Sequence, residues 1–124
     1  MSAPIAEAVV LSGCLRWLAD HGVYCWRNTT GAYQIQGRWI QYGKKGGADI
    51  LGIDNIGRLI CIECKSDRGR LSPEQEEFRR EIESRSGIYI LARSVDDLEA
   101  ALGSQSLMDF GSPKRRKEQH DARF

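Results

Sequence analysis

Two carboxylates and a lysine are the residues whose types and spacing best suggest chemistry in this sequence. Glu63 and Lys65 stand two positions apart in an otherwise apolar segment, so on a β-strand their side chains lie on one face. Asp49 begins the preceding predicted strand, and a tight turn between the two strands brings its carboxylate beside that of Glu63. Two carboxylates at close range repel each other unless a divalent cation lies between them, as Mg²⁺ does when it binds waters and substrate phosphate.

Each of these residues has a task in such a metal site. Asp49 and Glu63 would hold the ion, which lowers the pKa of a bound water and polarises a scissile phosphate. Lys65 would orient that water or neutralise the charge that develops on the phosphate. The alternative on spacing alone is a structural ion pair between Glu63 and Lys65 at the end of a strand.

Hydrophobic periodicity and turn residues predict the elements that must position this site. The fold class is α/β, with element order α-β-β-β-β-α-β-α and a mixed sheet flanked by helices. Strands Val23–Thr30 and Tyr33–Ile40 are expected to form a hairpin around Thr30-Gly31-Ala32. The remaining segments are expected as a helix at 4–21, strands at 48–53, 58–65 and 88–92, and helices at 73–86 and 96–102.

The second helix has a strong start signal. Ser72 is placed as the N-cap, Pro73 as the first helical residue and Gln75 at the third position of a capping box. Phe78 and Ile82 then give the helix its buried stripe. The strand Arg58–Lys65 is expected to be central in the sheet, where charged groups are costly unless they line a cleft.

Composition and charge limit the class of protein. A chain of 124 residues that is 41% hydrophobic and 28% charged suits one folded domain. Its longest uncharged stretch is too short to span a bilayer, so we expect a cytoplasmic protein with no membrane contact. Basic residues concentrate in the last fourteen residues, which hold five Lys or Arg against two acidic residues. That tail is either a cationic arm for phosphate or a solvated terminus.

The four cysteines do not predict a zinc site. Cys61 and Cys64 lie three apart on a predicted strand, so they point to opposite faces and cannot close on one tetrahedral metal. We expect Cys14, Cys25 and this pair to be small buried hydrophobic residues in a reducing compartment.

Asp49, the Glu63-Cys64-Lys65 motif and the segment Gly69–Gln75 together resemble the virus-type replication-repair nucleases (VRR-NUC) of the PD-(D/E)XK superfamily. The resemblance extends from about Glu7 to Leu102. It departs from the superfamily pattern at Ala48, where the superfamily has proline. The resemblance implies a single-domain, restriction-endonuclease-like fold over residues 1–103, followed by a flexible basic tail over 104–124.

The resemblance also implies roles for individual residues. Asp49, Glu63 and the main-chain carbonyl of Cys64 would be metal ligands, with Mg²⁺ or Mn²⁺ as the cofactor, and Lys65 would be the catalytic lysine. Glu7 would complete the metal shell through water, and the alternative is an exposed helix charge. Gln75 would support the site, and the alternative is its capping bond to Ser72 alone.

Contacts with DNA are expected at two clusters of polar and basic residues. Phosphate contacts come chiefly from Lys, Arg and small polar side chains, and the candidates are Arg27, Asn28, Thr29, Lys44 and Lys45, with Tyr33 nearby. Trp26, Trp39 and Tyr42 can stack on bases, but we expect them rather in the core or on a dimer surface.

The function that the resemblance implies is a metal-dependent DNA endonuclease leaving 5′-phosphate and 3′-hydroxyl ends. Because the chain is small, we expect selectivity for branched DNA, such as four-way junctions or flaps, in repair, recombination or replication. Short members of the family, many from bacteriophages, look like homodimers. If the protein is phage-encoded, the expected location is the host cell cytoplasm. No zinc or nucleotide cofactor is expected. The alternatives are a non-catalytic nucleic-acid-binding module and a nuclease for single-stranded DNA or RNA.

Overall fold

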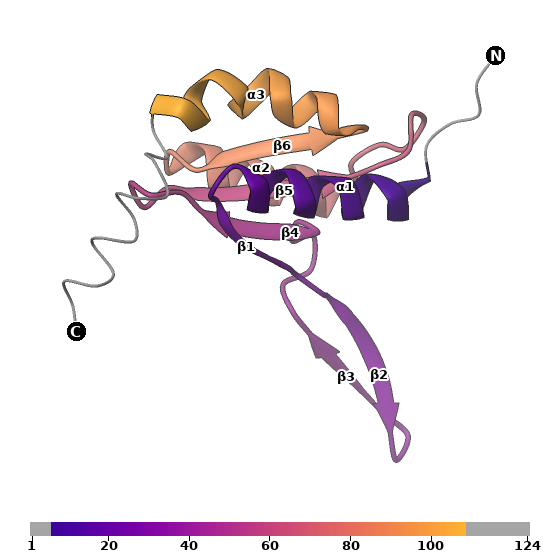
Figure 1. Cartoon of the computed structure of the whole chain (residues 1–124). Helices are drawn as coiled ribbons and strands as arrows, with labels where there is room; N and C mark the ends of the chain where they lie inside the picture. Colours follow the sequence, from indigo (N-terminus) through magenta and orange to yellow (C-terminus); the bar gives the residue numbers. More distant parts are fainter. Residues whose placement is uncertain (1–5, 109–124) are drawn as a thin grey trace, which may run out of the picture.

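The computed structural model describes the backbone of residues 6–108 and the side chains of residues 6–103. The described segment begins and ends with a helix, and most of its strands come before the second helix (Figure 1). In chain order the elements are α1 (Glu7–Asp20), β1 (Tyr24–Arg27), β2 (Gly31–Ile35), β3 (Arg38–Tyr42), β4 (Ile50–Ile53), β5 (Leu59–Cys64), α2 (Pro73–Ser84), β6 (Ile88–Ala92) and α3 (Val95–Met108).

Four of these strands form a mixed sheet in the order β1-β4-β5-β6. The pairs β1–β4 and β4–β5 are antiparallel, whereas β5 and β6 are parallel. A parallel pair needs a crossover connection, and α2 provides it. The sheet confirms the predicted mixed α/β architecture and the interior position of the strand that carries Glu63.

The helices cover the sheet in two layers. α1 and α3 pack on one face, and α2 packs on the other (Figure 1). Because strand side chains alternate, Ile60, Ile62 and Cys64 enter the core under α1 and α3, while Cys61 joins the smaller core under α2. Cys61 and Cys64 therefore face opposite sides of the sheet, as predicted.

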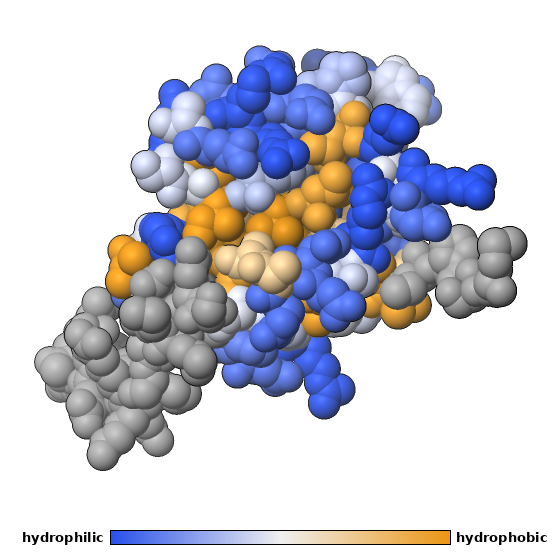
Figure 2. Space-filling model, turned by 90° about the horizontal axis from the view of Figure 1, so that it is seen from above, coloured by the Kyte–Doolittle hydropathy of each residue, from blue (hydrophilic) through white to orange (hydrophobic). Residues whose placement is uncertain are grey.

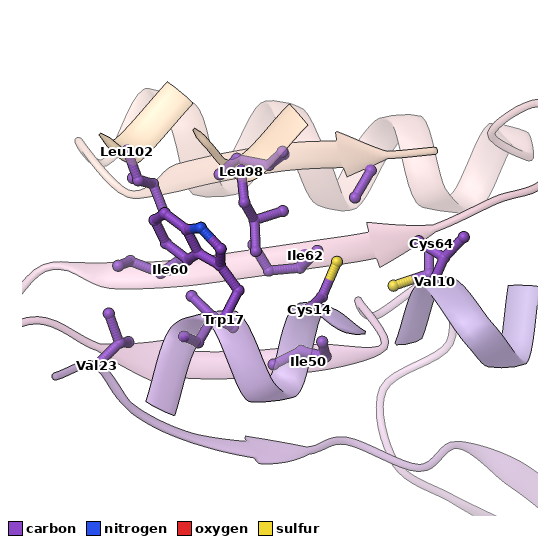
Figure 3. Packing of buried hydrophobic residues seen from close by; sticks show 13 residues of the cluster. Val10, Cys14, Trp17, Val23, Ile50, Ile60, Ile62, Cys64, Leu98 and Leu102 are labelled. Carbon is purple, nitrogen blue, oxygen red and sulfur yellow. The ribbon is translucent and has the colours of Figure 1, made fainter. Parts of the chain in front are cut away.

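The larger core has its centre at α1. Val10, Cys14, Trp17 and Leu18 recur at helical spacing and are all buried. Figure 3 shows Cys14 beside Cys64 of β5, and Trp17 reaching toward Leu102 of α3. The Trp17 indole N–H also donates a 2.8 Å hydrogen bond to Glu99, which ties α1 to α3.

The predicted hairpin is wrong in its pairing. Tyr24–Arg27 does not pair with the next segment but with β4, and the hairpin forms from β2 and β3 instead. Its two-residue turn is Gln36-Gly37, and both residues have positive φ. A turn with that geometry matches the right-handed twist of the flanking strands, so it is favoured over a turn at Thr30-Gly31-Ala32.

Three aromatic residues that the sequence places in the core or on a dimer surface are exposed, which contradicts the core position and leaves the dimer surface as a prediction. Trp39 and Tyr42 of the hairpin are 69% and 44% exposed, and Trp26 of β1 is 42% exposed. The hairpin extends away from the four-stranded sheet (Figure 1), so its side chains have no second layer to pack against.

Most other boundaries agree with the sequence to within a few residues. The capping box of Ser72 and Gln75 is present, and β6 covers the residues that were predicted. α3 continues to Met108, past the predicted domain boundary at residue 103. The basic tail at 111–124 lies outside the described residues.

Hydrophobic and hydrophilic residues separate at the surface of this layered domain. Seen from above, a strip of hydrophobic residues lies between hydrophilic regions (Figure 2). Among the described residues, none of the helices has the length and apolar character that crossing a bilayer would require.

Candidate active site

The register of β4 and β5 brings the two predicted carboxylates together. Ile50 pairs with Ile62, so Asp49, one residue before β4, comes opposite Glu63. The Asp49 Oδ2 atom accepts a 2.8 Å hydrogen bond from the backbone N–H of Cys64, which fixes this carboxylate against the end of β5.

Glu63 is buried, and its two carboxylate oxygens differ in their surroundings. Oε2 accepts a 3.1 Å hydrogen bond from the Gln75 side chain and lies 3.7 Å from the Lys65 ammonium. Oε1 is buried and has no hydrogen-bond partner among the described residues. Unpartnered buried oxygens are rare in proteins and call for an explanation, such as a missing ion or water.

The surroundings of Glu63 also change its acidity. Burial, and then the neighbouring Asp49 carboxylate, raise the pKa of Glu63 to about 7, while Lys65 opposes the shift. Burial disfavours the charged form of a carboxyl group, and a like charge has the same effect. A cation at this place would remove both penalties.

Gln75 makes the capping bonds and also contacts Glu63, while its support of a catalytic site stays a prediction. Its backbone N–H donates to the Ser72 hydroxyl at 3.2 Å, and its side-chain oxygen accepts from the Ser72 backbone N–H at 2.8 Å. Its side-chain NH₂ remains free to donate to Glu63. The first turn of α2 therefore orients the buried carboxylate through the same amide that closes the capping box.

Glu7 lies at the mouth of the site. Together with Asp49, Cys64 and Arg27 it lines an open pocket of about 320 Å³ between α1 and the edge of the sheet. Glu7 is exposed and lies on the first turn of α1. The structure thus brings Glu7 to the same pocket as Asp49 but gives it no direct contact with Glu63.

The donor set fits a hard divalent cation. Among the described residues, no group of three or more His, Cys, Asp and Glu side chains gathers as a ready-made metal site. Mg²⁺, however, is usually bound through one or two carboxylates and keeps several waters. Asp49 and Glu63 could supply those carboxylates, and Oε1 of Glu63 is a buried oxygen with no hydrogen-bond partner in the part of the chain that the structure describes.

Asn28 has a structural role that the sequence did not reveal. Its backbone N–H donates to the Asp49 carbonyl at 2.7 Å, and its side chain donates to the Ala48 carbonyl at 3.0 Å. Both bonds hold the backbone at Asp49. An asparagine just after a strand was the available signal, but nothing in the sequence shows which backbone it contacts.

The other predicted contact residues lie on two neighbouring segments. Thr29 is exposed where the chain leaves β1, and Lys44 and Lys45 lie in the glycine loop against α2. The Lys45 ammonium is 3.7 Å from the Glu74 carboxylate. Gly46 has a positive φ, and a Cβ there would lie 2.5 Å from the Glu74 carbonyl oxygen, so the loop needs glycine to pack this closely.

Sequence reasoning missed Tyr89. This β6 residue lies in the core under α2, and its buried hydroxyl has no hydrogen-bond partner among the described residues. The Arg79 guanidinium lies 5.6 Å from the centre of its ring. Burial, and then the charge of Glu63, raise the pKa of Tyr89. A tyrosine within an otherwise aliphatic strand was the signal.

The fold and the site define a small α/β domain with an acidic pocket at one end of a mixed sheet. Comparison with protein-family models, with curated proteins and with solved structures gave no match to this chain. Functional conclusions therefore rest on the geometry of the site and on the sequence motifs.

Proposed function

We propose that the protein is a Mg²⁺- or Mn²⁺-dependent DNA endonuclease of the PD-(D/E)XK type, with the VRR-NUC nucleases as the family it resembles. The observation that carries the proposal is the buried Glu63 carboxylate, which lies beside Asp49, Lys65 and Gln75. One of its oxygens has no hydrogen-bond partner within the described part of the chain. A structural ion pair with Lys65 explains the contacts of Oε2. It does not explain Oε1, because burying an oxygen without a hydrogen bond costs folding free energy.

Four side chains would have separate roles in phosphodiester hydrolysis, and Arg27 would contact the substrate. Asp49 and Glu63 would hold the metal, which supplies an activated water and polarises the phosphate. Lys65 places its ammonium beside Glu63, where it can hold the attacking water or stabilise negative charge on the phosphate. Gln75 keeps Glu63 oriented, and Arg27 lines the pocket where a phosphate would enter.

The proposed substrate is branched DNA, such as a four-way junction or a flap, and the proposed assembly is a homodimer. Two sites related by a two-fold axis would suit cuts on opposed strands.

Cleavage of a labelled four-way junction tests the proposal, with linear duplex and single-stranded DNA and RNA as controls, in Mg²⁺, Mn²⁺ or EDTA. We expect metal-dependent cutting by the wild type and loss of at least about a hundredfold in rate for Lys65→Ala, as for other removed electrostatic groups. Arg80→Ala, an exposed α2 change outside the site, should leave the rate unchanged.

If the wild type binds the junction but cuts no substrate in either metal, the protein is a non-catalytic binding module and the proposal fails. Cutting confined to single strands would keep the enzyme and replace the proposed substrate.

A further inference from the structure

The β2–β3 hairpin and its two connections, residues 28–47, form an arm that the proposed chemistry does not use. Every residue of β2 and β3 is exposed, and the arm extends away from the body of the domain (Figure 1). An isolated two-stranded hairpin is at best marginally stable in water. Such an arm is therefore expected to contact something else.

The charge of the arm indicates the kind of partner. The chain has 17 acidic residues, yet none lies between Asp20 and Asp49. The arm holds three basic residues, Arg38, Lys44 and Lys45, and Arg27 directly precedes it. Lys45 pairs with Glu74, whereas the described residues give Arg27, Arg38 and Lys44 no ion pair. A cationic surface without acidic residues is complementary to phosphate.

The base of the arm is fixed to the candidate active site. Asn28, the first residue of the arm, bonds to the backbone of Ala48 and Asp49, and Arg27 lines the pocket of Asp49. A second pocket of about 260 Å³ at this base is lined by Thr30, Tyr42 and Lys45, among others. A DNA backbone with a phosphate in the pocket of Asp49 and Arg27 would thus continue past the base of the arm.

The two faces of the arm differ. Directly paired residues share a face, so Tyr33, Ile35, Ile40 and Tyr42 lie on one side together with Arg38. The rings of Tyr33 and Tyr42 are 6.1 Å apart, in agreement with this register. The other face presents Trp39 between amide side chains. Aromatic side chains beside basic ones are the combination that contacts both bases and phosphates.

We propose that this arm is a DNA-binding ribbon that enters a groove of the duplex next to the scissile phosphate, an assignment that rests on the proposed nuclease function. The major groove admits a two-stranded β-ribbon. Five-residue strands extend about 17 Å, or about five base pairs at about 3.4 Å per pair. The arm of a second copy of the chain is a less suitable partner than DNA, because two such arms would bring like charges together.

The arm is tested by DNA binding with Arg38→Glu and, separately, Trp39→Ala. The matched control is Arg80→Glu, the same charge reversal on the exposed face of α2. Fluorescence anisotropy of a labelled 30-base-pair duplex in Ca²⁺ gives the affinity, thermal melting shows that each variant folds, and light scattering gives the mass. We expect about tenfold weaker binding for each arm variant, a smaller salt dependence for Arg38→Glu, and no change for the control.

Two outcomes would overturn the inference. Equal weakening by Arg38→Glu and Arg80→Glu would show a general charge effect, and a change from the mass of two chains to that of one would assign the arm to a second copy. Hydrolysis of bis(p-nitrophenyl) phosphate by the wild type in Mn²⁺ tests the nuclease chemistry separately. Arm-dependent DNA binding without that hydrolysis would contradict the proposed function and leave the arm as a DNA-binding element.

Discussion

At the residue scale, Glu63 is buried, lies beside the Asp49 carboxylate, and has one oxygen without a hydrogen-bond partner among the described residues. In the absence of metal, burial and Asp49 raise its pKa to about 7, compared with about 4.3 in an unfolded chain. At a pH between these two pKa values, Glu63 keeps its proton in the folded state but has released it in the unfolded state. The contribution of this group to the free energy of unfolding therefore falls as pH rises from about 4.3 to about 7.

Glu63→Gln should remove this pH dependence, because the amide has no proton to lose. In EDTA, we expect the variant to gain stability relative to the wild type between pH 5 and pH 8, by up to about 3 kcal/mol at about 1.4 kcal/mol per pKa unit. Urea denaturation at each pH measures the difference. A difference between the two proteins that stays constant over this range would contradict the raised pKa.

The sequence predicts Glu63 and Lys65 on one face because residues two apart on a strand share a face, and it predicts Asp49 beside Glu63 because a tight turn joins their strands. It could not predict the partner of Asn28 or the burial of Tyr89. Both depend on which segment packs against them, and a single sequence carries no direct signal for that.

At the element scale, the turn between β4 and β5 sets the register that places Asp49 opposite Glu63. Asp54, 4% exposed, accepts hydrogen bonds from the backbone of Ile56 at 3.0 Å and of Arg58 at 2.8 Å. Its second oxygen accepts from the Arg58 side chain at 2.6 Å. One carboxylate thus closes the whole turn.

Asp54→Ala should be strongly destabilising, since it removes a buried carboxylate that accepts from two backbone N–H groups and from the Arg58 side chain. We expect a loss of about 3 kcal/mol in the free energy of unfolding. Asp20→Ala is the control, because its 3.9 Å pair with Arg16 is exposed and should contribute less than about 1 kcal/mol. Chemical denaturation of both variants provides the comparison, and similar losses would contradict the role of the turn.

The N-terminus of α2 couples helix capping to the site, and two substitutions separate the effects. Ser72→Ala removes one capping acceptor and should cost about 1 kcal/mol of stability. Gln75→Leu keeps the Ser72 cap but removes the side-chain acceptor of the Ser72 N–H and the donor to Glu63, so we expect metal-dependent cleavage to fall about tenfold or more. Denaturation and cleavage rates measured on both variants test this, and equal cleavage rates would show that Gln75 is only a cap.

Element prediction succeeded where one signal dominates and failed where two compete. The capping box of Ser72 and Gln75 leaves little choice, and it was predicted correctly. Two glycine-containing turns were available around β2, and local sequence does not state that β1 pairs with β4, more than twenty residues away. The sequence therefore predicts one strand over Tyr33–Ile40, whereas the chain turns at Gln36-Gly37 within that range.

At the scale of the whole molecule, a compact α/β body carries the site, and the arm extends from the same end of the sheet (Figure 1). Periodicity predicted the mixed sheet and its covering helices, since each amphipathic element needs a layer to pack against. It could not predict that the arm lies outside those layers, because exposed and buried aromatic residues look alike in a sequence.

Binding of Mn²⁺ tests the central claim most directly, because the proposed chemistry depends on Asp49 and Glu63 holding a divalent ion, whatever DNA is cut. Isothermal titration calorimetry at pH 8, without DNA, should show Mn²⁺ binding to the wild type and to Lys65→Ala, and its loss in Asp49→Asn. A wild type that binds no Mn²⁺, or an Asp49→Asn variant that binds it as tightly as the wild type, would contradict the metal site and the nuclease built on it.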